Sequence, residues 1–143
     1  MSKRNAVLEA LTSVIAAALP GATVRRNEVL PEIVPAAGFA TVRDGDPGDP
    51  EATLSPLAYH WDHRAVVEII VVGNSAPVRD AAMDQKLTAI GARLSADRTL
   101  GGLCDWVRPL APQIETLGTE GAAPLLGCTL TIALTYSSAD ALA

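Results

Sequence analysis

Four acidic side chains lie close together in the sequence and are the first candidates for metal chemistry. They are Asp44, Asp46, Asp49 and Glu51. A calcium loop of the EF-hand type needs oxygen ligands at positions 1, 3, 5 and 12 and a glycine at position 6. Here the third acid occupies position 6, and Pro47 and Pro50 stiffen the path. We therefore expect a solvated acidic loop or a subunit-contact loop over Asp44–Glu51, and no metal ligands.

A second group with possible acid–base or metal chemistry is His60, Asp62 and His63. On an extended strand, His60 and Asp62 project to one side and His63 projects to the other. That geometry cannot bring all three side chains to one ion. The pattern favours surface positions on a strand.

Cys104 is followed by Asp105, which suggests a nucleophile beside a carboxylate. A catalytic cysteine also needs a histidine base and a group that orients it. The two histidines of the chain, His60 and His63, stand on a different segment. The sequence contains no phosphate-binding, dinucleotide-binding, zinc-ligand or nucleophile-elbow motif. We therefore predict no catalytic residues and no cofactor, while thiol-dependent acyl transfer through Cys104 remains an alternative.

The composition indicates a globular protein with an aliphatic core. The chain has 143 residues, of which 49% are hydrophobic and 3% aromatic, so we expect one domain over residues 1–143. Its net charge of -5 argues against a general nucleic-acid-binding protein, which needs a basic face to neutralise phosphates. Two cysteines, Cys104 and Cys128, are too few for a disulfide framework. No apolar run has the length of a membrane helix, and we expect a soluble protein made in a reducing cytoplasm.

Hydrophobic periodicity predicts two helices. The first starts at Ser2 and ends at Pro20-Gly21, and the second starts near Ser75 and buries Met83, Leu87, Ile90 and Leu94. The segment Asp97–Gly102 then predicts the end of this helix and a Gly-Gly turn.

The same patterns predict several strands. A long strand runs to Val72 with apolar residues on both faces at its far end, so we expect cover on both sides there. Its polar end, around His60–Arg64, should project beyond the body. Leu126–Tyr136 alternates regularly and is typical of a half-buried antiparallel strand. Shorter strands are expected at 23–28, 38–43, 54–59, 103–108 and 113–117.

These elements predict an α/β (α+β) fold. We expect a single mixed, mainly antiparallel sheet of four to five strands, with two helices packed on it and a protruding hairpin. Residues 137–143 should be frayed. If the strand after the Gly-Gly turn alternates, Cys104 and Trp106 share one face. Trp61 and Trp106 are expected in the core, although an exposed tryptophan on a projecting strand would be an interface anchor.

Several of these segments together resemble the tail-terminator proteins of long-tailed bacteriophages and gene transfer agents, the minor-tail-protein-U-like group. The resemblance extends over nearly the whole chain. Its segments are Ala18-Leu19-Pro20-Gly21-Ala22, Arg43–Gly48, Leu54–Leu57, Tyr59–Arg64, Asp97–Gly102 with Cys104-Asp105-Trp106, and the strand that ends near Tyr136.

The resemblance implies a structural protein of the virion, located at the head-proximal end of the tail and assembled in the bacterial cytoplasm. Such proteins form a hexameric ring that caps the tail tube and then joins the head connector, while DNA passes through the channel without specific binding. Asp44, Asp46, Asp49, Glu51, Trp61 and Asp62 are our candidates for the subunit interface or the channel. A head-closure or other connector protein of the same particle is the alternative within this class.

Overall fold

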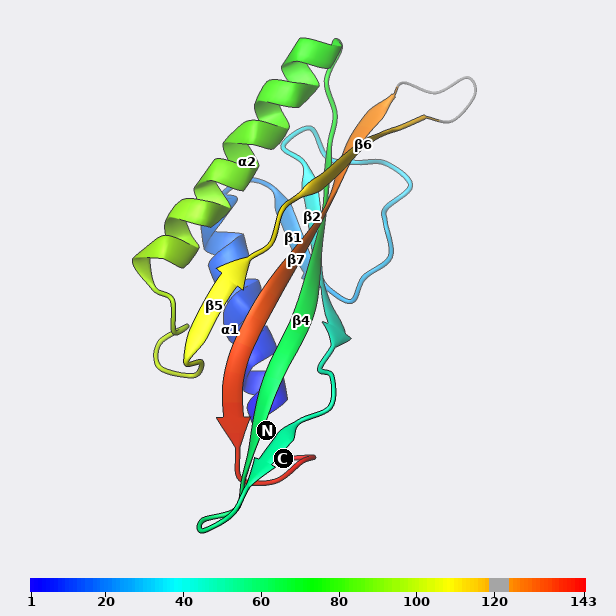
Figure 1. Cartoon of the computed structure of the whole chain (residues 1–143). Helices are drawn as coiled ribbons and strands as arrows, with labels where there is room; N and C mark the ends of the chain where they lie inside the picture. Colours follow the sequence, from blue (N-terminus) through cyan, green and yellow to red (C-terminus); the bar gives the residue numbers. More distant parts are fainter. Residues whose placement is uncertain (119–123) are drawn as a thin grey trace.

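The computed structural model describes residues 1–118 and 124–143 and confirms the predicted fold class (Figure 1). Two helices and seven strands make up this part of the chain. In order they are α1 (Lys3–Ala18), β1 (Thr23–Arg26), β2 (Phe39–Asp46), β3 (Glu51–Thr53), β4 (Ala58–Val71), α2 (Ala76–Ala96), β5 (Trp106–Pro109), β6 (Gln113–Leu117) and β7 (Leu125–Ser138).

The strands form one mixed, mainly antiparallel sheet. Its main path runs β1-β2-β4-β7-β5, while β3 pairs with β4 and β6 pairs with β7 beside that path. Only β1 and β2 run parallel among the described pairs. The expected four to five strands is therefore too few. The short strands β3 and β6 exist because each pairs along one end of a long strand.

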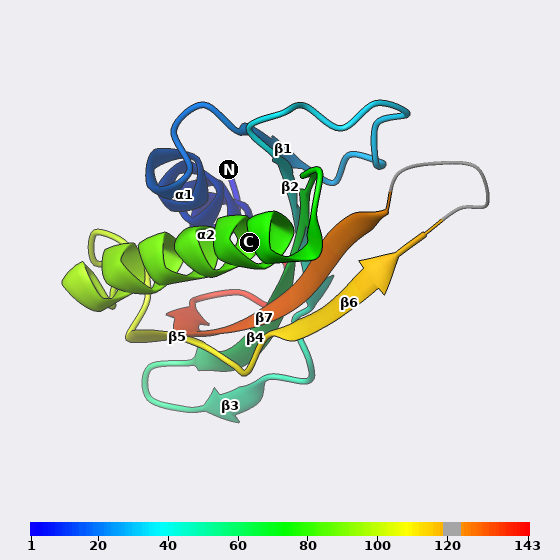
Figure 2. The ribbon, with the colours of Figure 1, turned by 90° about the horizontal axis from the view of Figure 1, so that it is seen from above.

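The longest element of the fold is the β4–β7 ladder, which extends from Tyr59 opposite Ser138 to Val71 opposite Leu126. The apolar side of each strand faces the helices, so Val67, Ile69, Ile132 and Leu134 are buried. Both helices pack on this one face (Figure 2). Burying each of these branched aliphatic side chains stabilises the fold by about 1.5–3 kcal/mol.

Each helix begins at the predicted serine. Ser2 Oγ accepts a hydrogen bond from the Asn5 amide at 3.1 Å, and Ser75 Oγ accepts one from the Val78 amide at 3.4 Å. These caps satisfy amide groups that have no partner within the helix. The residues that the helices bury recur at helical spacing: Val7, Leu8, Leu11 and Ile15 in α1, and Met83, Ile90 and Leu94 in α2.

The other face of the sheet is covered only at one end. Residues 27–37 run over the far end of β4, where the Glu28 amide donates to Thr41 Oγ1 and Ile70 is buried. This confirms the expected cover on both sides at that end. Toward the start of β4 the same face is open, and His60, Asp62 and Arg64 are exposed.

The acidic segment is shorter as a loop than predicted. Strand β2 continues to Asp46 and β3 begins at Glu51, so only residues 47–50 connect them. A bulge at Gly45, with φ of +68°, lets Asp46 pair with Arg64 after a register shift. The next predicted strand also starts later, at Ala58, because Leu54–Leu57 form a turn.

Two further expectations are wrong. Ser137 and Ser138 belong to β7, where they pair with His60 and Tyr59, so the strand extends into the segment expected to fray. Cys104 precedes β5 and is buried, whereas Trp106 is 54% exposed, so they do not share a face.

The turn after α2 forms as predicted. The Asp97 carboxylate accepts hydrogen bonds from the amides of Thr99 and Gly101 at 3.0 and 2.8 Å. The Val107 amide donates to the Arg98 carbonyl at 2.8 Å, and Arg98 Nη1 donates back to the Val107 carbonyl at 3.2 Å. The motif thus ties the end of α2 to the edge of β5.

The bulge gives a testable requirement for Gly45. An alanine Cβ there would lie 2.0 Å from the Arg64 carbonyl oxygen. We expect Gly45→Ala to lower the free energy of unfolding by about 3 kcal/mol or more, because the β2–β4 backbone must move. Gly101→Ala is the matched control, since φ is +72° but a Cβ meets no atom within 4 Å. Chemical denaturation of both variants measures the difference, and equal losses would contradict this account.

Candidate functional site

The β3–β4 hairpin projects from the body of the molecule, as predicted for the polar end of the long strand (Figure 1). Its strands pair from Glu51 opposite His60 to Thr53 opposite Ala58. At its tip, Leu54 is 80% exposed and Leu57 is 48% exposed. Between Glu51 and Asp62 the hairpin has no aspartate, glutamate, lysine or arginine. An apolar, uncharged tip on a projecting arm is suited to contact another molecule.

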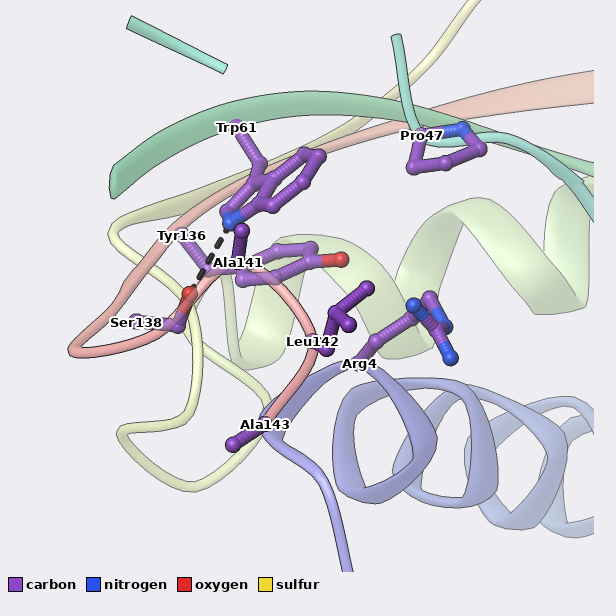
Figure 3. A pocket seen from close by; sticks show the side chains of 8 residues that line it. All are labelled: Arg4, Pro47, Trp61, Tyr136, Ser138, Ala141, Leu142 and Ala143. Carbon is purple, nitrogen blue, oxygen red and sulfur yellow. Dashed lines mark hydrogen bonds between the residues drawn. The ribbon is translucent and has the colours of Figure 1, made fainter. Parts of the chain in front are cut away.

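Trp61 stands at the root of this hairpin and is engaged within the chain. Its Nε1 donates to Ser138 Oγ at 3.0 Å, and its ring lies beside Tyr136, Pro47 and the residues that follow β7 (Figure 3). The cavity among these side chains has a volume of about 10 Å³. That is room for about one water molecule, so this cavity is too small for a ligand.

His63 points to the opposite side from His60 and Asp62, as predicted, but it is fully buried, so the expected surface position is wrong for His63. Its Nε2 contacts the Asp44 carbonyl oxygen, and its Nδ1 lies 2.7 Å from the Tyr136 hydroxyl. A carbonyl can only accept, so Nε2 carries the hydrogen and Nδ1 accepts from Tyr136. Burial lowers the pKa of His63 and outweighs the opposing effect of the Asp44 carbonyl.

Asp44 is separated from the other three acids by its partners. Burial raises the pKa of its carboxyl group, but hydrogen bonds from Arg26 and Asn27 outweigh burial and lower the pKa on balance. Arg26 binds both carboxylate oxygens, at 3.0 and 3.2 Å, and also donates to Asn5 in α1 at 2.7 Å. Asp44 therefore links β1, β2 and α1.

The remaining acidic candidates are on the surface. Asp46, Asp49 and Glu51 are exposed, and Asp46 Oδ1 accepts from the Gly48 amide at 2.9 Å. Asp62 is exposed beside Arg64, with 3.7 Å between the charged atoms. An ion pair that long and that exposed contributes little, in the range of about 0–1 kcal/mol.

Trp106 was expected in the core by default, but it lies on the open face of the sheet. It pairs with Thr135 of β7, and Thr135 pairs with Asp62 of β4. The guanidinium carbon of Arg108 lies 5.6 Å from the centre of the Trp106 ring, within cation–π range. Val107 was the signal in the sequence for this position of Trp106. If the apolar Val107 is buried, its neighbours Trp106 and Arg108 lie on the other face.

The described residues offer little to the chemical alternatives. Within residues 1–118 and 124–143, no three histidine, cysteine, aspartate or glutamate side chains gather as metal ligands do. Burial raises the pKa of the Cys104 thiol to about 12, whereas a nucleophilic cysteine needs a lowered pKa. In the same parts of the chain, no helix has both the length and the apolar character needed to cross a membrane.

Comparisons with known proteins add a structural likeness. No protein-family model matches the chain, and no curated protein matches it either. Among solved structures, a chain from the virion of a native gene transfer agent particle is similar, with a TM-score of 0.48 and 14% sequence identity. The likeness covers 94% of this chain and 94% of that chain. At that level of similarity, function has to be inferred from the surfaces of the chain itself.

The buried histidine predicts how stability depends on pH. The pKa of His63 is lower in the folded chain than its ordinary value of 6.5, so the unfolded chain binds more protons below that pH. The free energy of unfolding should therefore be constant well above pH 6.5 and fall, by at most about 1.4 kcal/mol per pH unit, as the pH decreases from about 6.5 through the folded pKa.

Denaturation at several pH values measures this slope. We expect His63→Gln to remove the part of the fall that begins near pH 6.5 and to leave the part that Asp44 causes at more acidic pH, whereas His60→Gln, on the exposed hairpin, should retain both. If His63→Gln does not fold, an NMR titration of His63 in the unmodified chain decides. A titration at or above pH 6.5 would contradict the prediction.

The two buried thiols predict slow alkylation. Burial raises the pKa of both Cys104 and Cys128, so few thiolates form at neutral pH. We expect iodoacetamide to modify both residues at least about 100-fold more slowly in the folded chain than in the unfolded chain. Mass spectrometry of Cys104→Ser and Cys128→Ser assigns the rates. One fast-reacting thiol at Cys104 would favour the acyl-transfer alternative.

Proposed function

We propose that this chain is a structural protein of a phage-like tail. In this proposal it associates with itself into a ring, caps the tail tube, ends tube growth and offers the head-tail joining surface. The observation that carries the proposal is the projecting β3–β4 hairpin with its exposed apolar tip, beside a sheet face that is half open. A protein that works through contacts needs such surfaces, and an enzyme of this size would need a pocket with reactive groups.

The distribution of side chains supports a role in assembly. Trp106 and the hairpin residues Leu54 and Leu57 expose apolar surface, whereas the titratable group buried deepest, His63, is hydrogen-bonded within the chain. Tryptophan is enriched at the energetic centres of interfaces. The net charge of -5 also suits a channel that DNA crosses without binding, because phosphates are repelled.

A connector protein of the same particle remains the second candidate, because a connector could make its contacts equally well with a similar domain and a projecting hairpin. The two functions differ in what the ring binds. A terminator binds the end of a polymerised tail tube, and a connector binds the portal side of the particle. Electron microscopy of negatively stained protein, alone and mixed with tail tubes, separates them.

The hairpin tip gives the variant for this test. We expect the wild-type chain to form six-fold rings and to cap tube ends, and Leu54→Ser/Leu57→Ser to keep the rings but bind tube ends about tenfold more weakly, through lost apolar contact. Val78→Ser, at a 49% exposed position on α2, is the matched control and should cap normally. Rings that never bind tube ends, or a hairpin variant that caps as the wild type does, would contradict the terminator role.

A further inference from the structure

The edge of the sheet formed by β5 carries an arginine and a tryptophan on the open face. Trp106 is 54% exposed, and Arg108 stacks over its ring at 5.6 Å. Among the described residues, the ion pairs are Arg26–Asp44, Arg43–Glu68 and Arg64–Asp62, and Arg108 belongs to none of them. We call Trp106 and Arg108 the Trp–Arg edge. Tryptophan and arginine are the residues most enriched at the energetic centres of interfaces.

The opposite side of the same sheet is acidic beyond the end of β1, the edge strand there, which pairs only with Phe39–Val42 of β2. Asp46 ends β2, Glu51 begins β3, and Asp49 lies in the connection between them. All three are exposed, and none takes part in an ion pair within the described part of the chain. We call these three residues the acidic edge. Asp44 is not part of it, because Arg26 neutralises Asp44 within the chain.

The geometry points to a contact between these two edges, and we infer that the Trp–Arg edge of one copy binds the acidic edge of a second copy of this chain. The inference rests on the proposed function, which requires self-association, and it names the surfaces that meet. The charges are complementary: in this contact the guanidinium of Arg108 in one copy faces the carboxylates of Asp46, Asp49 and Glu51 in the next copy. The apolar face of Trp106 adds contact area.

The contact must form between molecules, because the sheet holds its own two edges apart. In the row that contains Asp46, the register runs from Asp46 to Arg64, then Ala133 and then Arg108, across β2, β4, β7 and β5. Three strand spacings separate β2 from β5 by about 14 Å. The β4–β7 ladder at the centre keeps this distance constant.

Two different edges that recognise each other make a heterologous interface. Repeated from copy to copy, such an interface closes into a ring when the rotation between neighbours allows it. The backbone of β5 is already bonded to Arg98, so the contact uses side chains and adds no strand to the sheet. Arg64 and Asp62 lie between the two edges. Their charged atoms are 3.7 Å apart and exposed, so this weak ion pair is free to exchange for other partners.

Charge reversal tests this contact with two variants. Arg108→Glu makes the Trp–Arg edge acidic, and Asp49→Lys/Glu51→Lys makes the acidic edge basic. We expect each variant alone to raise the concentration at which half the chain is assembled by about 30-fold or more, as measured by sedimentation velocity. In an equimolar mixture the two variants should alternate around the ring, because every junction is then complementary, and assembly should return to within about tenfold of wild type.

Matched controls carry the same charge changes elsewhere. Arg25→Glu on β1 and Glu32→Lys/Glu115→Lys are exposed positions outside both edges and should assemble as the wild type does. Circular dichroism and denaturation confirm that each variant is folded. If the wild type assembles and the edge variants assemble equally well, or if their mixture is not rescued, the edge contact is refuted while the ring proposal stands. A wild type that stays monomeric at every concentration refutes both.

Discussion

The pairing of β4 with β7 is the constraint on which the rest of the structure depends. The ladder joins thirteen residue pairs, and every other strand except β1 pairs with one of these two strands. Because strand side chains alternate, each long strand has one side toward the helices and one side away from them. Two helices on a single face then leave the second face to residues 27–37 at one end and to solvent at the other. The open face is thus a consequence of the topology.

The length of β4 also produces the hairpin. The strand continues beyond the region that the helices and residues 27–37 cover, and β3 folds back along it. At this root the buried side of β4 carries His63 where a purely aliphatic strand would carry valine or leucine. The Asp44 carbonyl and the Tyr136 hydroxyl satisfy both ring nitrogens, so the polar group is tolerated. The Asp44 carbonyl that binds His63 immediately precedes the bulge at Gly45. The bulge positions Asp46 and thus the acidic edge.

Periodicity was sufficient to predict the helices, the long strands and the fold class. The stripe in α2 and the alternation in β7 each bury one face, and that requirement is visible in the sequence. The prediction that His63 lies opposite His60 and Asp62 succeeded for the same reason. Strand β3 could not be predicted from periodicity, because its three residues are all exposed and show no alternation. Strand β6 was predicted as a strand, although its five residues alternate little. Both are stabilised by pairing with distant residues.

The candidate site was predictable only as a set of residue types. Asp44, Asp46, Asp49 and Glu51 look equivalent in the sequence, and only the approach of Arg26 from β1 separates Asp44 from the others. Trp106 could have been placed on the open face from the burial of Val107, but its opposition to the acidic edge depends on the strand order. Strand order is set by contacts between distant parts of the chain, which local patterns do not encode.

Native mass spectrometry of the wild-type chain over a range of concentrations tests the central claim most directly. Self-association through two different edges of one sheet predicts a single closed oligomer whose mass is a fixed multiple of 14.8 kDa, with six copies as the expected number. A chain that remains monomeric at every concentration would contradict the account.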